Sequence, residues 1–223
     1  MIIDFHTHLG FAVTKADSNE TSILSSLKDN NITKVVVFPT KTIEGYEVMN
    51  NQVIKFAEQN PEIIPFIRLT PESNCIPKKA VGVKIHPLAD EWSINDFKDL
   101  MPRLKGLIVL FHSDKHLIRE FKPLIKEFPD IKFVAAHGSR TKAHLEAYKE
   151  CPNLYYDTSI KMSPYSMKVF TSIDEKRVLF GSDHPFSTQK IELMRVKLNP
   201  YINDRVKNLI LGLNAQELLN KKQ

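Results

Sequence analysis

The sequence predicts an α/β fold in which eight parallel strands and their connecting helices form a single compact (β/α)₈ barrel with short loops. The main observation is an alternation of short runs rich in β-branched and aromatic residues with longer polar segments of helical period. Several of the short runs are apolar almost throughout, as expected for strands buried on both faces of a parallel sheet. No glycine-rich phosphate turn follows the first run, which disfavours an open dinucleotide-binding sheet.

The eight apolar runs are predicted to be the barrel strands. They cover residues 1–6, 34–38, 63–68, 81–86, 106–112, 131–136, 153–157 and 177–180. A strand count of eight favours a closed barrel over a doubly wound sheet. The chain has 223 residues, near the lower limit of about 200 for such barrels, so we expect an open, shallow pocket without a large lid.

Helices are predicted between most of these strands, because apolar residues recur there at helical spacing. The predicted helices cover residues 21–30, 45–59, 93–103, 115–127, 141–149, 164–172 and 188–198, with one or two closing helices over 204–220. The connection over 70–79 contains two prolines and is too short and broken for a full helix.

The composition is that of an ordinary globular domain over residues 1–223, with 42% hydrophobic and 26% charged residues. The net charge of +5 comes from scattered lysines and arginines with no basic block, so we expect neither nucleic-acid nor membrane binding. Cys75 and Cys151 form no CxxC pair, and no secretion signal or membrane-spanning run is visible. A cytoplasmic protein is therefore expected.

Histidines gather at the predicted C-terminal ends of the strands. His6 and His8 are two residues apart, so both side chains point to the same side of a strand, with Cα atoms about 6.6 Å apart. Six of the eight histidines lie at or just past such strand ends: His6, His8, His86, His112, His137 and His184. Each one alone is better explained as a hydrogen-bonded core residue. Because barrel enzymes keep their sites at this end, the whole set, together with Asp183, predicts a metal site.

Several stretches resemble the amidohydrolase superfamily, and in particular its small amidohydrolase-related barrels, which include the aminocarboxymuconate semialdehyde and resorcylate decarboxylases. The matching stretches are residues 3–8, 82–87, 136–138, 153–159 and 180–186, and residues 212–219 resemble the closing helix of that branch. The resemblance covers essentially the whole chain. The long pocket-shaping loops of the larger family members are missing.

The resemblance implies a catalytic metal centre. By this similarity His6, His8, His112 and Asp183 ligate a divalent metal, with zinc favoured and manganese or iron as alternatives. His137 would be a further ligand or the group that orients and polarises the substrate. In binuclear members of the superfamily a carboxylated lysine on the fourth strand bridges two metals, and Lys84 occupies that strand here. We expect one ion rather than two.

Lys84 and His86 are assigned to substrate binding, because they share one face of the fourth predicted strand. Lys84 could anchor a substrate carboxylate, as could Arg68, or it could pair with a nearby acid. His184 is expected to support Asp183 or to cap its loop.

The leading functional prediction is hydrolysis of a small amide, lactone or ester, with Asp183 and His137 as the catalytic residues. A metal-activated water would lose its proton to Asp183, while His137 polarises the carbonyl under attack. The same ligands would serve the alternative, a non-oxidative decarboxylase of an aromatic or unsaturated carboxylic acid.

Two other classes are less favoured. A TatD-like nuclease would require a glutamate at the end of a middle strand, where this chain has Lys84 and His86 instead. A binding protein with an inactive barrel would be expected to have lost ligands. The expected partner is a small-molecule substrate, and a homodimer is expected from the resemblance alone.

Overall fold

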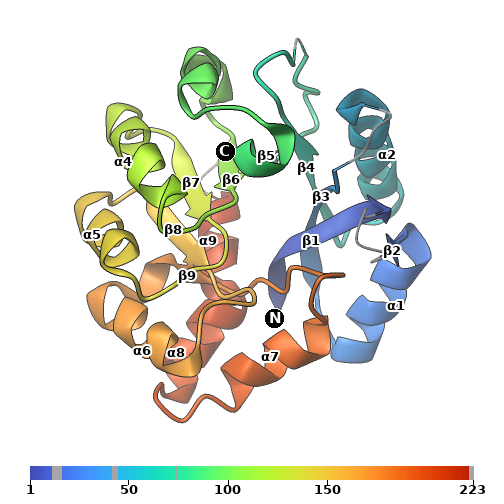
Figure 1. Cartoon of the computed structure of the whole chain (residues 1–223). Helices are drawn as coiled ribbons and strands as arrows, with labels where there is room; N and C mark the ends of the chain where they lie inside the picture. Colours follow the sequence, from blue (N-terminus) through green and yellow to red (C-terminus); the bar gives the residue numbers. More distant parts are fainter. Residues whose placement is uncertain (12–16, 42–44, 74, 221–223) are drawn as a thin grey trace.

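The computed structural model describes residues 1–11, 17–41, 45–73 and 75–220, and Figure 1 shows a ring of helices around a curled sheet. In the described part of the chain, eight strands pair in parallel in the order β1-β3-β4-β5-β6-β7-β8-β9. Their bounds are β1 (Ile3–Phe11), β3 (Lys34–Pro39), β4 (Ile63–Arg68), β5 (Gly82–Ile85), β6 (Ile108–Phe111), β7 (Lys132–Ala135), β8 (Leu154–Asp157) and β9 (Val178–Leu179). A short strand, β2 (Asp17–Ser18), pairs antiparallel with the end of β1.

The sheet closes where the segment after β9 lies beside β1. The backbone N–H of Phe5 donates to the carbonyl of Phe180, and that of His8 donates to the carbonyl of His184, both at 2.8 Å. In the opposite direction, the N–H of Asp183 donates to the carbonyl of His6 at 2.8 Å. The prediction of a (β/α)₈ barrel is thereby confirmed, and the seam of the barrel lies at three of the predicted metal ligands, His6, His8 and Asp183.

The helices lie outside the sheet. They are α1 (Glu20–Asn30), α2 (Tyr46–Gln59), α3 (Pro87–Asp90), α4 (Leu117–Glu127), α5 (Lys142–Glu150), α6 (Pro164–Ile173), α7 (Gln189–Lys197), α8 (Asp204–Asn208) and α9 (Asn214–Asn220), with a π-helical turn (Leu209–Leu213) between the last two. Side-chain caps set several of the starts. Thr141, Ser163 and Thr188 each accept the backbone N–H of the residue three positions further on, which satisfies a donor that the first helical turn leaves free.

The helix predicted over 93–103 is wrong in type, since the chain forms a 3₁₀ helix (Asn95–Leu104) there. Pro102 lies inside it, and a proline has no N–H to donate and collides with the carbonyl four residues earlier in an α-helix. A second, short 3₁₀ helix (Glu175–Arg177) precedes β9. Between β4 and β5 no helix occurs in the described residues, as the two prolines predicted.

The core has two layers. One cluster of buried residues fills the space between sheet and helices, and a second fills the inside of the barrel, with Phe5, Phe38 and Phe66 among its members. Gly82 makes the inner layer possible, because a Cβ there would lie 2.4 Å from the Phe66 ring and 2.5 Å from the Ile108 carbonyl. Ala215 of α9 belongs to the inner cluster, so α9 covers the end of the barrel opposite the strand C-termini (Figure 1).

Two further observations bear on the expectations from composition. No helix in the described ranges is both long enough and apolar enough to cross a bilayer. Cys75 is exposed, Cys151 is buried, and neither is disulfide-bonded.

Candidate active site

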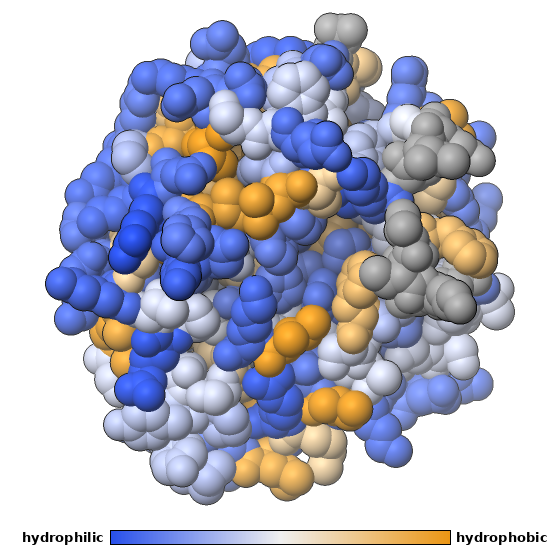
Figure 2. All heavy atoms as spheres, in the orientation of Figure 1, coloured by the Kyte–Doolittle hydropathy of each residue, from blue (hydrophilic) through white to orange (hydrophobic). Residues whose placement is uncertain are grey.

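A cavity of about 310 Å³ opens at the C-terminal end of the strands. Figure 2 shows this face of the molecule, on which hydrophilic surface predominates and apolar residues form separate patches. The lining includes all seven residues that the sequence assigns to the site: His6, His8, Lys84, His86, His112, His137 and Asp183. The volume is at the lower end of the range of about 300–1,000 Å³ for small-molecule sites, so the cavity suits a compact substrate.

His6 and His8 converge on Asp183. The Nε2 atoms of both rings lie close to Asp183 Oδ1, at 2.9 Å for His6 and 3.0 Å for His8. The first strand does not end at these histidines, as the sequence suggested, but continues to Phe11 because its last residues pair with β2. A shift of register between Asp4 and Thr7 interrupts the pairing of β1 with β3 where the histidines are placed.

Asp157, at the end of β8, fixes the orientation of His6. His6 Nδ1 lies 2.7 Å from Asp157 Oδ2, and both side chains are fully buried. Because the carboxylate can only accept, Nδ1 carries the proton and the Nε2 lone pair faces the cavity. Sequence reasoning missed Asp157 as a site residue. The signal was available, since Asp157 ends a predicted strand as the site histidines do.

The arrangement of these atoms fits a bound cation. His6 Nε2 and Asp183 Oδ1 are both acceptors, and at 2.9 Å they need a positive charge, a proton or a metal ion, between them. Burial and Lys84 lower the pKa of His6, but Asp183 and Asp157 outweigh them and raise it. Burial would raise the pKa of Asp183, yet His6 and His8 hold it well below its usual range. Two imidazoles and one carboxylate are a donor set that zinc, manganese and iron accept.

His137 stands next to this group. Its Nδ1 lies 2.9 Å from Ser159 Oγ, which itself donates to Asp157, so Nδ1 carries the proton and Nε2 faces the cavity, 3.9 Å from Asp183 Oδ2. Burial, together with the neighbouring His6, lowers the pKa of His137 to about 4, which keeps the ring neutral at pH 7. The backbone amide of His137 also donates to Asp157, at 2.9 Å, so one carboxylate orients two histidines.

Both His137 and Asp183 have left-handed backbone conformations, each with φ of 60°. Such a conformation is uncommon for residues other than glycine, although asparagine, aspartate and histidine adopt it more often than the rest, and surrounding contacts are needed to hold it. Here the enforcing contacts are the hydrogen bonds from the His137 amide to Asp157 and from the Asp183 amide to the His6 carbonyl. Two of the left-handed residues thus lie where the strands end and present their site side chains.

Asp4, a second residue that sequence reasoning missed, fastens the Asp183 loop to β1. Its fully buried carboxylate accepts the Ser182 amide at 2.9 Å, the Ser182 hydroxyl at 2.6 Å and Gln189 Nε2 at 2.8 Å. Burial raises the pKa of Asp4, although these donors favour the ionised form. The position of Asp183 thus depends on a residue that does not line the cavity.

Two imidazole rings are stacked on the side of the cavity that faces Asp183. The His86 and His112 rings are 4.1 Å apart and nearly parallel, and His86 Nδ1 accepts the Ala89 amide at 3.2 Å. Burial, with His137 and Lys84 nearby, lowers the pKa of His112 to about 2, and burial also lowers that of His86. His112 lies beside His137, with ring centres 4.9 Å apart.

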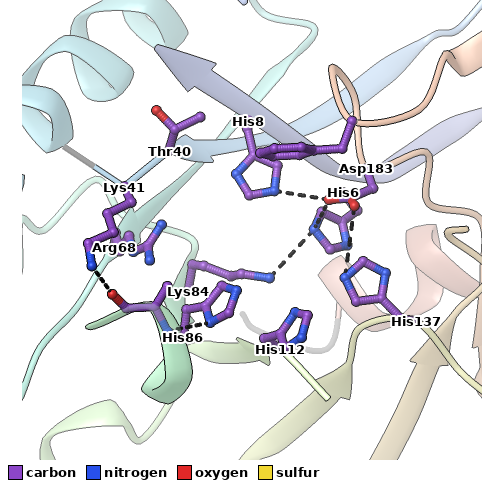
Figure 3. Close-up of a pocket in the computed structure, with 12 residues that line it drawn as sticks. His6, His8, Thr40, Lys41, Arg68, Lys84, His86, His112, His137 and Asp183 are labelled. Atoms are coloured by element: carbon purple, nitrogen blue, oxygen red, sulfur yellow. Dashed lines mark hydrogen bonds and ion pairs between the residues drawn. The ribbon is translucent and has the colours of Figure 1, made fainter. Parts of the chain in front are cut away.

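The predicted ligands therefore differ in how closely they gather. Among the described residues, two groups place their potential ligand atoms within 4.8 Å of one another. These groups are His6, His8 and Asp183, and His6, His137 and Asp157. His112 is in neither group. It reaches the same cavity but packs on His86, as Figure 3 shows. His184 does not line the cavity, and neither of its ring nitrogens has a hydrogen-bond partner in the structure.

Lys84 and Arg68 are both buried cations, but their surroundings differ. Arg68 forms a bidentate pair with Asp90, at 2.9 and 3.2 Å, and lies over the Tyr46 ring. Lys84 makes no ion pair within the described ranges; its Nζ lies 3.5 Å from His6 Nε2 and 4.9 Å from the centre of the Phe38 ring. Burial lowers the pKa of Lys84 to about 8. Lys84 is therefore a buried cation available to an acidic ligand.

A closed (β/α)₈ barrel whose histidines and carboxylates converge at the C-terminal rim defines the class as a barrel enzyme. The sequence model of one family, described as amidohydrolase, matches residues 3–221. The chain belongs to the amidohydrolase family, which supports a divalent-metal site and confirms the resemblance found in the sequence. Comparison with curated proteins gives no match.

Solved structures share the fold at low identity. An amidohydrolase from Burkholderia multivorans with bound zinc matches with a TM-score of 0.79 at 12% identity, covering 99% of both chains. A dihydroxybenzoic acid decarboxylase from Polaromonas sp. JS666, with bound manganese and the inhibitor 2-nitroresorcinol, matches with a TM-score of 0.74 at 11% identity, covering 100% of this chain and 97% of that one. A 5-carboxyvanillate decarboxylase from Sphingomonas paucimobilis matches with a TM-score of 0.72 at 13% identity, covering 98% of both.

Proposed function

We propose that this enzyme is a metal-dependent, non-oxidative decarboxylase of a small aromatic or unsaturated carboxylic acid. The observation that carries the proposal is the position of Lys84. This buried cation has no ion-pair partner in the described residues. It lies 3.5 Å from His6, which is a member of the candidate metal group. A substrate carboxylate bound by Lys84 would lie at the reacting centre itself, rather than at the far end of the cavity.

The proposal reverses the order of the two functions that the sequence suggested. Two of the three neighbouring structures described above are decarboxylases. Hydrolysis of a small amide, lactone or ester remains the second candidate. Asp183 favours it, because a carboxylate beside two histidines is what a general base for water activation requires.

The proposed ligands of a single divalent ion are His6, His8 and Asp183, with His137 and His112 completing the set. Zinc, manganese and iron fit these donors. When bound, the ion would supply positive charge that stabilises the negative charge developing on the substrate. Asp157 holds His6 in the tautomer that leaves Nε2 free.

The side chains of this chain have distinct roles in the proposed reaction. Lys84 donates a hydrogen bond to the substrate carboxylate, and the flat His86 ring packs against the substrate. Loss of carbon dioxide leaves an electron pair on the ring carbon, and that carbon must receive a proton. The proton comes from solvent water, because Asp183 is ionised and His137 is neutral in the free site. Asp183 would relay this proton to the substrate carbon, and His137 Nε2, 3.9 Å from Asp183 Oδ2, would exchange protons with it.

A product assay tests the proposal. The purified protein, loaded with zinc or manganese, is incubated without oxidant with dihydroxybenzoates, 5-carboxyvanillate and muconate-type acids, and separately with lactones, esters and amides. We expect one carbon dioxide released per decarboxylated product and no release after chelation of the metal. Lactone or amide hydrolysis without any carbon dioxide release would instead support the second candidate.

A further inference from the structure

The proposed reaction does not use one buried histidine, which lies outside the cavity. His144 lies in the first turn of α5, is fully buried and does not line the cavity. Burial lowers its pKa to about 4, so the ring is neutral at pH 7. A buried neutral imidazole needs hydrogen-bond partners for both ring nitrogens, and the identity of these partners shows what it holds together.

The side chain of His144 is part of a series of hydrogen bonds in which each group donates to the next. The Thr141 hydroxyl accepts the His144 backbone amide, so it can donate its own proton to His144 Nδ1, 2.7 Å away. Nε2 then carries the ring proton and faces Ser113 Oγ at 3.4 Å. The Ser113 hydroxyl donates to the carbonyl of Ala136. All these donors and acceptors are satisfied only by the Nε2-protonated tautomer.

This chain of hydrogen bonds joins the ends of two neighbouring strands. Ser113 directly follows His112 after β6, and Ala136 directly precedes His137 after β7. His144 Nδ1 also lies 3.3 Å from Ser139 Oγ, two residues beyond His137. One imidazole on α5 therefore contacts both segments that carry site histidines.

We infer that His144 is a positioning residue that fixes His112 relative to His137. His112 has few other restraints. Its ring stacks on His86, and its backbone N–H donates a hydrogen bond to the Ile85 carbonyl. The two rings meet at 4.9 Å and 67°, a relation that depends on how the β6 and β7 ends are spaced. Loss of the His144 bridge would let that spacing vary.

The Ser113–His144 pair is not itself a nucleophilic site. Both side chains are fully buried outside the cavity, and the Ser113 proton is committed to a backbone carbonyl. An activated serine needs its hydroxyl exposed to the substrate and its proton directed at the base. The geometry shows the opposite direction of donation.

The chain offers a matched pair of variants and a matched control. In His144→Gln the side-chain amide keeps an N–H donor toward Ser113, whereas His144→Leu keeps similar bulk without any donor. Asn153→Ala is the control. Asn153 is equally buried and its side chain binds the carbonyls of Ile125, Phe128 and Ile131, where the chain enters β7 and β8 at the other end of the barrel.

Three readouts are made on the full-length protein. They are the zinc dissociation constant by competition with a chelating dye, the thermal midpoint, and the ¹H–¹⁵N spectrum of the imidazole rings in the metal-free protein. We expect His144→Leu to weaken zinc binding about tenfold, the lower end of the range for residues that orient metal ligands, and His144→Gln to restore most of it. Asn153→Ala should lower the thermal midpoint and leave zinc affinity unchanged.

The effect of His144 on zinc binding rests on the proposed metal site. The imidazole spectrum of the metal-free protein tests the positioning role independently of that site. If the wild-type protein binds no zinc, the metal site is wrong, but displaced His112 and His137 signals in His144→Leu would still support the positioning role. Unchanged signals together with unchanged zinc affinity in His144→Leu would overturn it. Should His144→Leu fail to fold, Ser113→Ala removes the same link with a smaller change and is expected to give the same tenfold loss.

Discussion

The two sides of the cavity are built differently. One side, here called the ligand wall, consists of His6, His8, His137 and Asp183 with Asp157 behind them. The other, called the binding wall, consists of Lys84 and His86, and the proposed ligand His112 joins the two walls by stacking on His86. In the ligand wall, His6 lies between two carboxylates at 2.7 and 2.9 Å. In the binding wall the contacts are a ring stack at 4.1 Å and a lysine whose nearest polar contact is 3.5 Å long.

This difference matches what each wall would do in the proposed reaction. Groups that hold a metal work best when they are already in place, because no reorganisation is then needed at the moment of reaction. A wall that receives a substrate must instead exchange its contacts for new ones. The comparison therefore predicts that changes in the ligand wall affect metal affinity and turnover, while changes in the binding wall affect substrate affinity.

The largest effect is expected for Asp183→Asn. Asparagine keeps the shape but has neither the negative charge facing His6 and His8 nor the ability to transfer a proton. We expect kcat/KM to fall about 1,000-fold, within the range for removal of a general acid–base group, and metal content to fall as well. Steady-state kinetics and elemental analysis measure both, with Asp174→Asn, which pairs with Arg177 away from the cavity, as the control. Retained turnover would contradict the role given to Asp183.

Asp157→Asn should have the next largest effect. The substitution removes the charge that accepts the His6 Nδ1 proton, so His6 loses its fixed tautomer. Zinc affinity is expected to fall about 10- to 100-fold. Competition with a chelating dye measures it, and an unchanged dissociation constant would mean that Asp157 serves only the fold.

Lys84→Gln tests the binding wall. Loss of a charge-assisted hydrogen bond of about 1.5–3 kcal/mol predicts a rise in KM for a carboxylate substrate of about tenfold or more. Zinc affinity should not fall, because the substitution removes a positive charge 3.5 Å from His6 Nε2. Lys79→Gln is the matched control, because Lys79 is largely exposed and pairs with Glu58 on the surface. A loss of zinc binding in Lys84→Gln would place Lys84 in the ligand wall instead.

The smallest effect is expected for His86→Phe. Phenylalanine keeps a flat ring to stack on His112 but cannot accept the Ala89 amide. A difference of about 1 kcal/mol corresponds to a change in KM of about fivefold, with kcat nearly unchanged. Kinetics with one aromatic acid would decide the point, since a large fall in kcat would require His86 to take part in the chemistry.

Most of the fold could be predicted because its signal is local. All eight predicted strands lie where the structure has them, since strands buried on both faces are continuous apolar runs. The full length of β1 could not be predicted, because the extension to Phe11 depends on pairing with β2 rather than on its own sequence. The 3₁₀ helix (Asn95–Leu104) could not be anticipated from Pro102 alone, because α4 is an α-helix with Pro123 inside it.

The site was predictable to the extent that it lies at strand ends. Parallel strands of a barrel present their C-terminal ends at one rim, so the histidines there were expected to meet. Asp4 could not be found in this way. Its partner Ser182 is 178 residues further along the chain. The residues around Asp4 in the sequence do not indicate such a distant contact. The left-handed backbone of His137 likewise arises from its contact with Asp157.

The seam of the barrel has a consequence for how the protein matures. His8 and Asp183 are 175 residues apart, so a chain emerging from the ribosome lacks part of the proposed ligand set until Asp183 has been made. A metal ion that needs both would not nucleate folding and would act only on the finished barrel. Excess ion would then raise the unfolding temperature with the logarithm of its concentration, because it binds the native protein and not the unfolded one.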